Sequence, residues 1–430
     1  SRIYRYQSKV SELLSFNKKS LTNSWSSLDV ESLLSEAAQG IEAGSATDSG
    51  RFGKIPTNHP DPIFLAGGIP DDTALPIDDL IQGFTKAIKN QSAESLMYGG
   101  WFGYSGCREA IAERQNKLEG THLTESNIIM HNGSSGCLEN ILRAFVQPGD
   151  VVIVESPSYS GTVRAILGYQ AEVVEVPMNR HGIDPDLFAE TVLQLKSQGK
   201  RVKLFYTIPD YHNPMGNVTD LEIRQSILQT CGEHKIIVAE DAAYSELHYD
   251  VPPPPSYYAL SDGHGVLRMC SFSKIIATGL RAGWIQARKD YADVLTRVRF
   301  DMGNSPLVHF VLEDFIKSGR LDTHVESMRK LYREKCFAML ESLKTHCEPY
   351  TEVDTPEGGY FLWVRARLGK ASELVKAATD EGLIFPEGNV FFVDKEPDDD
   401  HFRLAFTRAS LANIEESGKR LRKAFEKILD

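Results

Sequence analysis

Between about residues 125 and 290, short apolar runs rich in β-branched residues recur, and helix-like patterns separate many of them. A run that is apolar at every position predicts a strand that is covered on both faces. Strands that alternate with helices predict an α/β fold with a mainly parallel, seven-stranded sheet. The seven runs are 127–130, 150–154, 171–177, 202–208, 235–239, 266–272 and 283–287.

The chain on either side of these runs is organised differently. Residues 1–60 show weak helical periodicity and a Gly/Ser-rich stretch, which indicates an arm or entry segment. After the sheet, residues 322–345 carry apolar side chains at helical spacing, and strand-like pieces and a last helix follow. We therefore expect an N-terminal arm and a segment joining the small domain over 1–75, a large α/β domain over 76–315 and a small α+β domain over 316–430.

The composition argues against several classes of partner. The formal net charge is −12, and an acidic chain repels the phosphates of nucleic acids and anionic membrane surfaces. No apolar run approaches the length of a membrane span. The six cysteines form no CxxC pair and no histidine cluster has zinc-ligand spacing, so we expect reduced thiols, no metal and a cytoplasmic protein.

Polar side chains follow the predicted strands, at the edge where ligands collect in parallel sheets. One strand leads into Ser271-Phe-Ser-Lys274, and Arg281 comes seven residues later. A lysine beside hydroxyls and an arginine suits a phosphate-bearing aldehyde, with Lys274 as the Schiff-base amine. Ser271, Ser273 and Arg281 would then bind the phosphate. In isolation, a lysine after a strand is more often a surface residue.

Two other strand ends carry groups suited to the ring of such a cofactor. Asp241 follows one apolar run and can pair with a protonated pyridine nitrogen, which keeps the ring an electron sink. Tyr244, and Asn213 in an Asn-Pro-Met-Gly stretch, supply hydrogen bonds for the phenolic oxygen of the ring. Taken alone, a strand-terminal aspartate is about as often a helix cap, and an Asn-Pro pair is more often a simple turn.

Three further features complete the candidate site. The turn Ser134-Ser135-Gly136 lies between a strand and a helical pattern, where backbone donors bind phosphate. Tyr159 offers a ring that can stack on the cofactor, although a half-buried core tyrosine would look the same. Arg403 lies among apolar residues that predict a strand, and a buried guanidinium needs an anion. A substrate α-carboxylate fits this arginine, and an internal salt bridge is an equal alternative.

Together these residues resemble the fold-type I pyridoxal-phosphate enzymes, specifically the class I and II aminotransferases. The resemblance covers roughly residues 62–430, and its motifs occur in the order typical of that family. The matching motifs are Gly67-Gly-Ile-Pro70, Tyr98 with Gly103 and Gly106, Asn213-Pro-Met-Gly216, Asp241-Ala-Ala-Tyr244, the run from Ser271 to Gly283, Pro356-Glu-Gly-Gly359 and Arg403-Leu-Ala-Phe406.

The resemblance implies pyridoxal 5'-phosphate as the cofactor, with Lys274 as its covalent anchor and as the proton shuttle. It implies a homodimer whose active site lies at the subunit interface, where Tyr98 of the partner subunit reaches the phosphate. The substrate carboxylate would be held by Arg403, with help from Asn213 and the backbone of Gly68. The implied phosphate ligands include Ser134, Ser135 and Gly136, and the implied ring contacts include Tyr159.

The pattern most resembles the branch of aromatic-amino-acid, 2-aminoadipate and kynurenine aminotransferases. The implied function is transfer of an α-amino group from an aromatic or 2-aminoadipate-like L-amino acid to a 2-oxo acid such as 2-oxoglutarate. A lysine-anchored cofactor that is aminated by one substrate and restored by the other predicts ping-pong kinetics.

The chain departs from the family at several positions. His212 stands for the usual Gln, Met215 for the usual Thr and Thr278 for the usual Pro, and Ser135-Gly136 replaces polar amides. Because His212 and Met215 lie close to the implied cofactor, a different pyridoxal-phosphate reaction stays open. The candidates are decarboxylation, β- or γ-replacement, oxidation and carbon–carbon bond formation, since function lies in the site and not in the fold.

Two readings outside this cofactor class are weaker. Ser271-Phe-Ser-Lys274 also fits the Ser-x-x-Lys pattern of penicillin-binding acyl enzymes, but that class also needs Ser-Asp-Asn and Lys-Thr-Gly, which do not occur. A transcriptional regulator with an aminotransferase-like domain would carry a DNA-binding region ahead of it. Residues 1–60 show no clear helix-turn-helix, and the chain is acidic.

Overall fold

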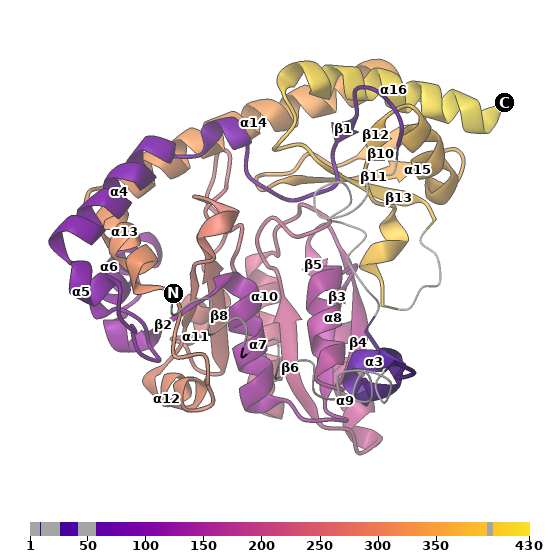
Figure 1. The fold of residues 1–430 in the computed structure, drawn as a ribbon. Helices are drawn as coiled ribbons and strands as arrows, with labels where there is room; N and C mark the ends of the chain where they lie inside the picture. Colours follow the sequence, from indigo (N-terminus) through magenta and orange to yellow (C-terminus); the bar gives the residue numbers. More distant parts are fainter. Residues whose placement is uncertain (1–8, 10–25, 42–56, 394–398) are drawn as a thin grey trace. The chain divides into compact units, whose positions relative to one another are not determined.

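Figure 1 shows the fold in a computed structural model that describes residues 9, 26–41, 57–393 and 399–430. The contacts divide the chain into two units, residues 1–43 and residues 44–430. Within the first unit, two short helices are described, Val30–Leu33 (η1) and Glu36–Gln39 (α3). Each begins after a side chain, that of Asp29 or Ser35, which accepts a backbone N–H of the first turn.

The second unit is built around an eight-stranded sheet with the order β2-β9-β8-β7-β6-β3-β4-β5. Adjacent strands from β8 to β4 run parallel, whereas β9 is antiparallel to both β2 and β8, and β5 turns back on β4. The strands are β2 Ile128–His131, β3 Val151–Ser156, β4 Glu172–Asn179, β5 Gly182–Ile183, β6 Val202–Thr207, β7 Ile237–Asp241, β8 Val266–Ser271 and β9 Gly283–Gln286.

The sheet confirms the predicted fold class, and each of the seven predicted runs forms a strand. Every residue of β2, β8 and β9 is buried, as expected of strands that are covered on both faces. The eighth strand, β5, was not predicted, because its two residues are too few to show a pattern.

Helices connect the strands and cover the sheet (Figure 1). Helix α9 illustrates the local signals, because the side chain of Asp184 accepts the N–H groups of Asp186 and Leu187 and Pro185 occupies the first helical position. The helices are α4 Ile77–Asn90, α5 Ser92–Ser95, α6 Ser105–Glu119, α7 Gly133–Phe145, α8 Ser160–Gly168, α9 Pro185–Ser197, α10 Leu221–His234, α11 Tyr257–Ser261, α12 Lys289–Arg297 and α13 Pro306–Lys317.

The C-terminal part begins with α14, Arg320–Cys347, which runs from α13 toward a second sheet and packs against α16 (Figure 1). That sheet has three antiparallel strands in the order β10-β11-β13. Besides α14, the C-terminal part contains β10 Thr351–Val353, β11 Phe361–Ala366, α15 Ala371–Asp380, η6 Gly388–Phe391, β13 His401–Ala405 and α16 Leu411–Leu429.

A short parallel pair links the beginning of the second unit to this C-terminal part. Strand β1, Ile63–Phe64, pairs with β12, Leu383–Ile384. The segment after β1 therefore passes close to the C-terminal sheet, and the N–H of Ala405 donates to the carbonyl of Leu65 at 2.8 Å. The predicted domain bounds after residues 75 and 315 stay a prediction.

Within the described ranges, no helix has both the length and the apolar character that crossing a bilayer requires. Among the same residues, no group of three or more His, Cys, Asp or Glu side chains is placed to hold a metal ion. All six cysteines are buried and carry free thiols.

Candidate active site

Most of the predicted site residues lie at or after the ends of strands whose carboxyl ends share one edge of the large sheet, whereas Gly68, Tyr98 and Arg403 come from elsewhere. Strands β3, β6, β7 and β8 are parallel, and β2 has the same direction, because β9 is antiparallel to both β2 and β8. In α/β sheets this edge is where ligands bind. The fold therefore brings together loops that are far apart in sequence.

Lys274 lies just after β8 and points toward the segment that follows β1. Its Nζ donates to the carbonyl of Gly68 at 2.5 Å and lies 5.9 Å from the centre of the Tyr244 ring. The hydroxyl of Tyr360 donates to the Lys274 carbonyl at 2.7 Å, which fixes the backbone of the lysine loop. Three of the predicted residues thus meet at the lysine amine, and Tyr360 is a supporting residue that sequence reasoning missed.

Asp241 ends β7 and receives two hydrogen bonds. The Tyr206 hydroxyl donates to Oδ2 at 2.8 Å, and the N–H of Ala243 donates to Oδ1 at 3.1 Å. Burial raises the pKa of Asp241 to about 6, although both hydrogen bonds and the nearby Lys274 lower it. A cationic ring nitrogen beside this carboxylate would favour its charged form.

Arg403 lies in β13 and is only 1% exposed. Its guanidinium donates to Asn213 Oδ1 at 2.7 Å and to the carbonyl of Ala66. The rings of Phe361 and Phe391 lie 4.5 and 4.8 Å from the guanidinium carbon, which is cation–π distance. Both rings are almost fully buried, so they hold the guanidinium in place, and a buried guanidinium suits a carboxylate.

Asn213 connects this arginine to Tyr244. The Oδ1 of Asn213 accepts from Arg403, which leaves the amide N–H groups of Asn213 as donors on the other side. The side chains of Asn213 and Tyr244 are hydrogen-bonded to each other. Burial raises the pKa of Tyr244, so its hydroxyl stays protonated and can donate. The two side chains thus place two donors side by side, as binding an anionic ring oxygen requires.

An anion cradle forms around Arg281. The guanidinium donates to the Asn132 carbonyl at 2.8 Å, to Ser135 Oγ at 3.3 Å and to Ser273 Oγ at 3.4 Å. Ser271 Oγ accepts the Ser273 N–H at 3.1 Å. Residues Ser134 to Gly136 form the first turn of α7, where unpaired N–H groups and the helix dipole attract a phosphate.

Two predicted aromatic residues differ in their surroundings. Tyr159 directly precedes α8, is partly buried and packs on the core. A Cβ at Gly161 would lie 2.7 Å from the Tyr159 ring, so this glycine makes room for the ring. Tyr98 is 81% exposed, and its predicted role requires a second subunit.

These residues fit pyridoxal phosphate in each of its parts. The lysine amine suits the aldehyde, the buried Asp241 suits the ring nitrogen, and the Arg281 cradle suits the phosphate. Tyr206, which holds Asp241, was missed because the sequence does not show which strands are adjacent. The β6–β7 pairing places Tyr206 opposite Ala239, two residues from Asp241.

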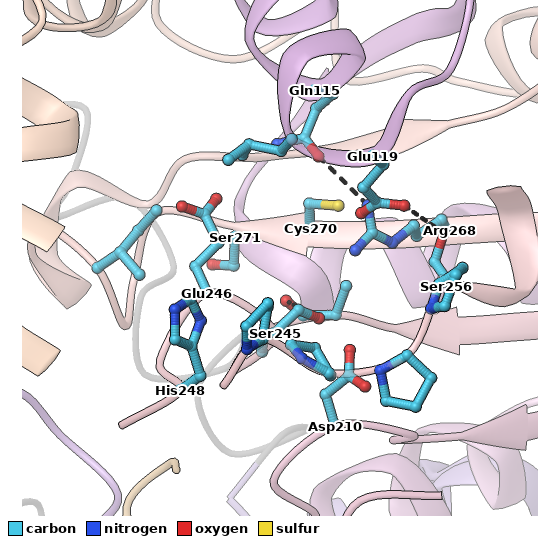
Figure 2. Close-up of a pocket in the computed structure, with 18 of the residues that line it drawn as sticks. Gln115, Glu119, Asp210, Ser245, Glu246, His248, Ser256, Arg268, Cys270 and Ser271 are labelled. Carbon is cyan, nitrogen blue, oxygen red and sulfur yellow. Dashed lines mark hydrogen bonds and ion pairs between the residues drawn. The ribbon is translucent and has the colours of Figure 1, made fainter. Parts of the chain in front are cut away.

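A separate cavity of about 260 Å³ lies on the face of the large sheet that carries the side chains of Arg268 and Cys270 of β8 (Figure 2). Arg268 pairs with Glu240 of β7. The side chain of Glu240 projects to the opposite face of the sheet from that of the adjacent Asp241. Figure 2 shows Arg268 between Gln115 and Glu119. Ser271 is the one predicted site residue in its lining, so this cavity is distinct from the candidate active site.

The chain matches the family described as aminotransferase class I and II over residues 61–421. It is 30% identical over 397 residues to aromatic-amino-acid aminotransferase 1 of Thermococcus litoralis, covering 92% of this chain and 94% of that protein. It is 27% identical over 379 residues to 2-aminoadipate transaminase of Thermus thermophilus, covering 87% and 92% of the two chains. The crystal structure of kynurenine aminotransferase from Pyrococcus horikoshii in complex with PMP superposes with a TM-score of 0.86 at 28% identity, covering 94% of this chain and 99% of that one.

Proposed function

The chain belongs to the class I and II aminotransferases, and we propose that it transfers the α-amino group of an aromatic or 2-aminoadipate-like L-amino acid to a 2-oxo acid such as 2-oxoglutarate. Transamination with pyridoxal 5'-phosphate follows from the family, and the donor and acceptor are the proposal. Relatives named for aromatic amino acids, 2-aminoadipate and kynurenine support this donor class.

The observation that carries the proposal is the position of Arg403 between Phe361 and Phe391. A guanidinium buried in this way binds a carboxylate through two parallel hydrogen bonds. It binds anions that keep their hydration shell less well. Phe361 and Phe391 are only 0% and 1% exposed, so they pack against the guanidinium and hold it in place for the α-carboxylate. The relatives named for aromatic amino acids, 2-aminoadipate and kynurenine support the choice of side chain.

We assign the chemical steps to residues as follows. Bound pyridoxal phosphate supplies an electron sink for the charge left at the substrate α-carbon. Lys274 would hold the cofactor covalently, and its Nζ, when free, would take and return the substrate α-proton. Asp241, as a carboxylate, would pair with the ring nitrogen and keep it protonated.

The remaining residues bind and orient. Asn213 and Tyr244 would donate to the ring oxygen, and Tyr159 would stack on the ring. Arg281, with the hydroxyls of Ser134, Ser135, Ser271 and Ser273 and the N-terminus of α7, binds the phosphate. Arg403, Asn213 and the Gly68 backbone hold the substrate carboxylate. Because one substrate must leave before the second enters the same site, we expect ping-pong kinetics.

We propose that the enzyme is a homodimer. An apolar surface is exposed around Met97 at 68%, Tyr98 at 81% and Phe300 at 88%, more than single exposed residues of a monomer explain. In the dimer, Tyr98 of the partner subunit would donate to the phosphate. Six free, buried thiols support the proposal that the protein works in the reducing cytoplasm.

A donor panel tests the function. The cofactor-loaded protein is mixed with single L-amino acids and 2-oxoglutarate, and kcat/KM is measured from the 2-oxo acid and glutamate formed. We expect kcat/KM for phenylalanine, tyrosine, tryptophan, kynurenine or 2-aminoadipate to exceed that for the other amino acids by about tenfold or more. One well-placed apolar group contributes a factor of this size. A panel led by alanine or aspartate would contradict the proposed donor class.

A further inference from the structure

A buried histidine lies directly beside Asn213. His212 is 1% exposed, and its Nε2 lies 3.1 Å from Oε2 of Glu155, which is 2% exposed. On the other side of the ring, Nδ1 accepts the N–H of Met215 at 3.4 Å. Since Nδ1 accepts a hydrogen bond, the proton of the neutral ring is on Nε2, which contacts the carboxylate at 3.1 Å without the alignment of a full hydrogen bond.

Glu155 is itself fixed by the end of the neighbouring strand. Its Oε1 accepts the Thr207 hydroxyl at 2.6 Å, and its Oε2 accepts the N–H of Ile208 at 2.9 Å. Thr207 is fully buried and belongs to β6, whose Tyr206 holds Asp241. The carboxylate at the end of β3 thus accepts two hydrogen bonds at the end of β6, as a buried charge requires, and it also contacts the histidine.

The turn that carries Asn213 is held at both sides of this histidine. The His212 N–H donates to the Asn217 carbonyl at 3.0 Å, and the His212 carbonyl accepts the Gly216 N–H at 2.6 Å. With the Met215 contact to the ring, three hydrogen bonds of His212 enclose the turn. The orientation of Asn213 depends on this turn, because its Oδ1 must face Arg403 for its N–H groups to face the cofactor.

We propose that His212 is a positioning residue, which couples Glu155 to the 213–216 turn through the buried 3.1 Å contact of its Nε2 donor and the acceptor at Nδ1, and so fixes the Asn213 amide against the cofactor ring oxygen and Arg403. The proposal rests on the role of Asn213 in the proposed function. It requires the donor and acceptor pair and not the imidazole itself. A glutamine amide has the same pair, whereas leucine has neither group.

The test is a spectroscopic pH titration of the cofactor-loaded protein without substrate. An Asn213 N–H that donates to the ring oxygen stabilises its anionic form, so loss of that bond raises the pH midpoint of the visible absorbance change. We expect His212→Leu to raise the midpoint by about 0.5 unit or more, as loss of one such hydrogen bond does, and His212→Gln to stay near wild type. His181→Leu is the matched control, because it removes an exposed histidine 3.0 Å from the Asp220 carboxylate, and it should change nothing.

The same titration of Asn213→Ala distinguishes a failure of the inference about His212 from a failure of the proposed role of Asn213. If Asn213→Ala shifts the midpoint and a folded His212→Leu does not, the inference is wrong and the role of Asn213 stands. If neither shifts it, both are wrong. An equal shift in His212→Gln and His212→Leu would also overturn the inference, because the imidazole itself would then matter. Should His212→Leu fail to fold, Glu155→Gln, which keeps the size of the partner, must raise the midpoint, and an unchanged midpoint contradicts the inference.

Discussion

The hydroxyl of Tyr206 donates to Asp241 Oδ2 at 2.8 Å across the β6–β7 pair. This bond and the Ala243 N–H lower the pKa of a carboxyl whose burial otherwise raises it, to a net value of about 6. The active carboxylate is therefore tuned by a residue that belongs to the strand core.

Tyr206→Phe should remove the bond with little change of shape. Losing a donor to the carboxylate raises the pKa of Asp241, so more of it is protonated just below neutral pH. In the cofactor-free protein we expect the pKa of Asp241, measured from the pH dependence of thermal unfolding, to rise by about half a unit or more. An unchanged pH dependence of unfolding would show that Tyr206 does not tune Asp241.

Asp241→Asn should separate function from stability. The folded-state pKa is raised from 3.8 to about 6, so the ionised carboxylate destabilises the cofactor-free fold above that pH. At pH 7.5 the free energy of unfolding of the variant should exceed that of wild type by about 1–2 kcal/mol, and its unfolding temperature should be higher. Both differences should shrink as the pH falls below 6 toward 4. Transamination should fall by about 100-fold or more, since the ring nitrogen loses its anionic partner. Thermal unfolding of the cofactor-free proteins across pH measures the stability effect, and an unchanged or lower midpoint at pH 7.5 would contradict it.

Arg403→Lys keeps the charge and loses the planar fork. We expect KM for the amino donor to rise by about 10- to 100-fold with a smaller effect on kcat, because substrate binding loses a two-point contact. Arg408→Lys is the control, since Arg408 forms an exposed pair with Asp72 at 3.0 Å. Equal effects at the two positions would argue against a carboxylate site at Arg403.

Gly133→Ala should weaken cofactor binding. Gly133 has φ of +74°, and a Cβ there would lie 3.1 Å from an Arg281 guanidinium nitrogen. The variant should raise the cofactor Kd by about tenfold or more, as displacement of one charged phosphate ligand does. Gly149→Ala has a similar φ of +81° with no atom within 4 Å, so it shares the backbone strain and should leave the Kd unchanged. Equal Kd values for the two variants would contradict the cradle at Arg281.

The sequence predicted the sheet well because continuous apolar runs and cofactor motifs are both local. Asp241 at the end of β7 and Lys274 after β8 could be predicted from the sequence for the same reason. Contacts between strands could not be, since adjacency in a sheet is a long-range property. Tyr206 looked like part of an apolar run, and Glu155 looked like one residue of a strand end, until the β3–β6–β7 order placed them beside Asp241 and His212.

Strand β5 and the exposure of Tyr98 show two further limits. Two residues give no period, so β5 appears only through its pairing with β4. The proposed role of Tyr98 would require a second copy of the chain, and no pattern within one chain predicts where that copy would bind. Motifs that are local in sequence thus predict chemistry better than they predict the contacts that tune it.

The central claim is that Lys274 is the covalent anchor of the cofactor. The most direct measurement is borohydride reduction of the loaded protein, followed by digestion and mass spectrometry to locate the phosphopyridoxyl group. We predict modification at Lys274 and its loss in Lys274→Ala, whose fold should persist. A phosphopyridoxyl group on another lysine of the wild-type protein, or none after loading, would contradict the assignment of this active site.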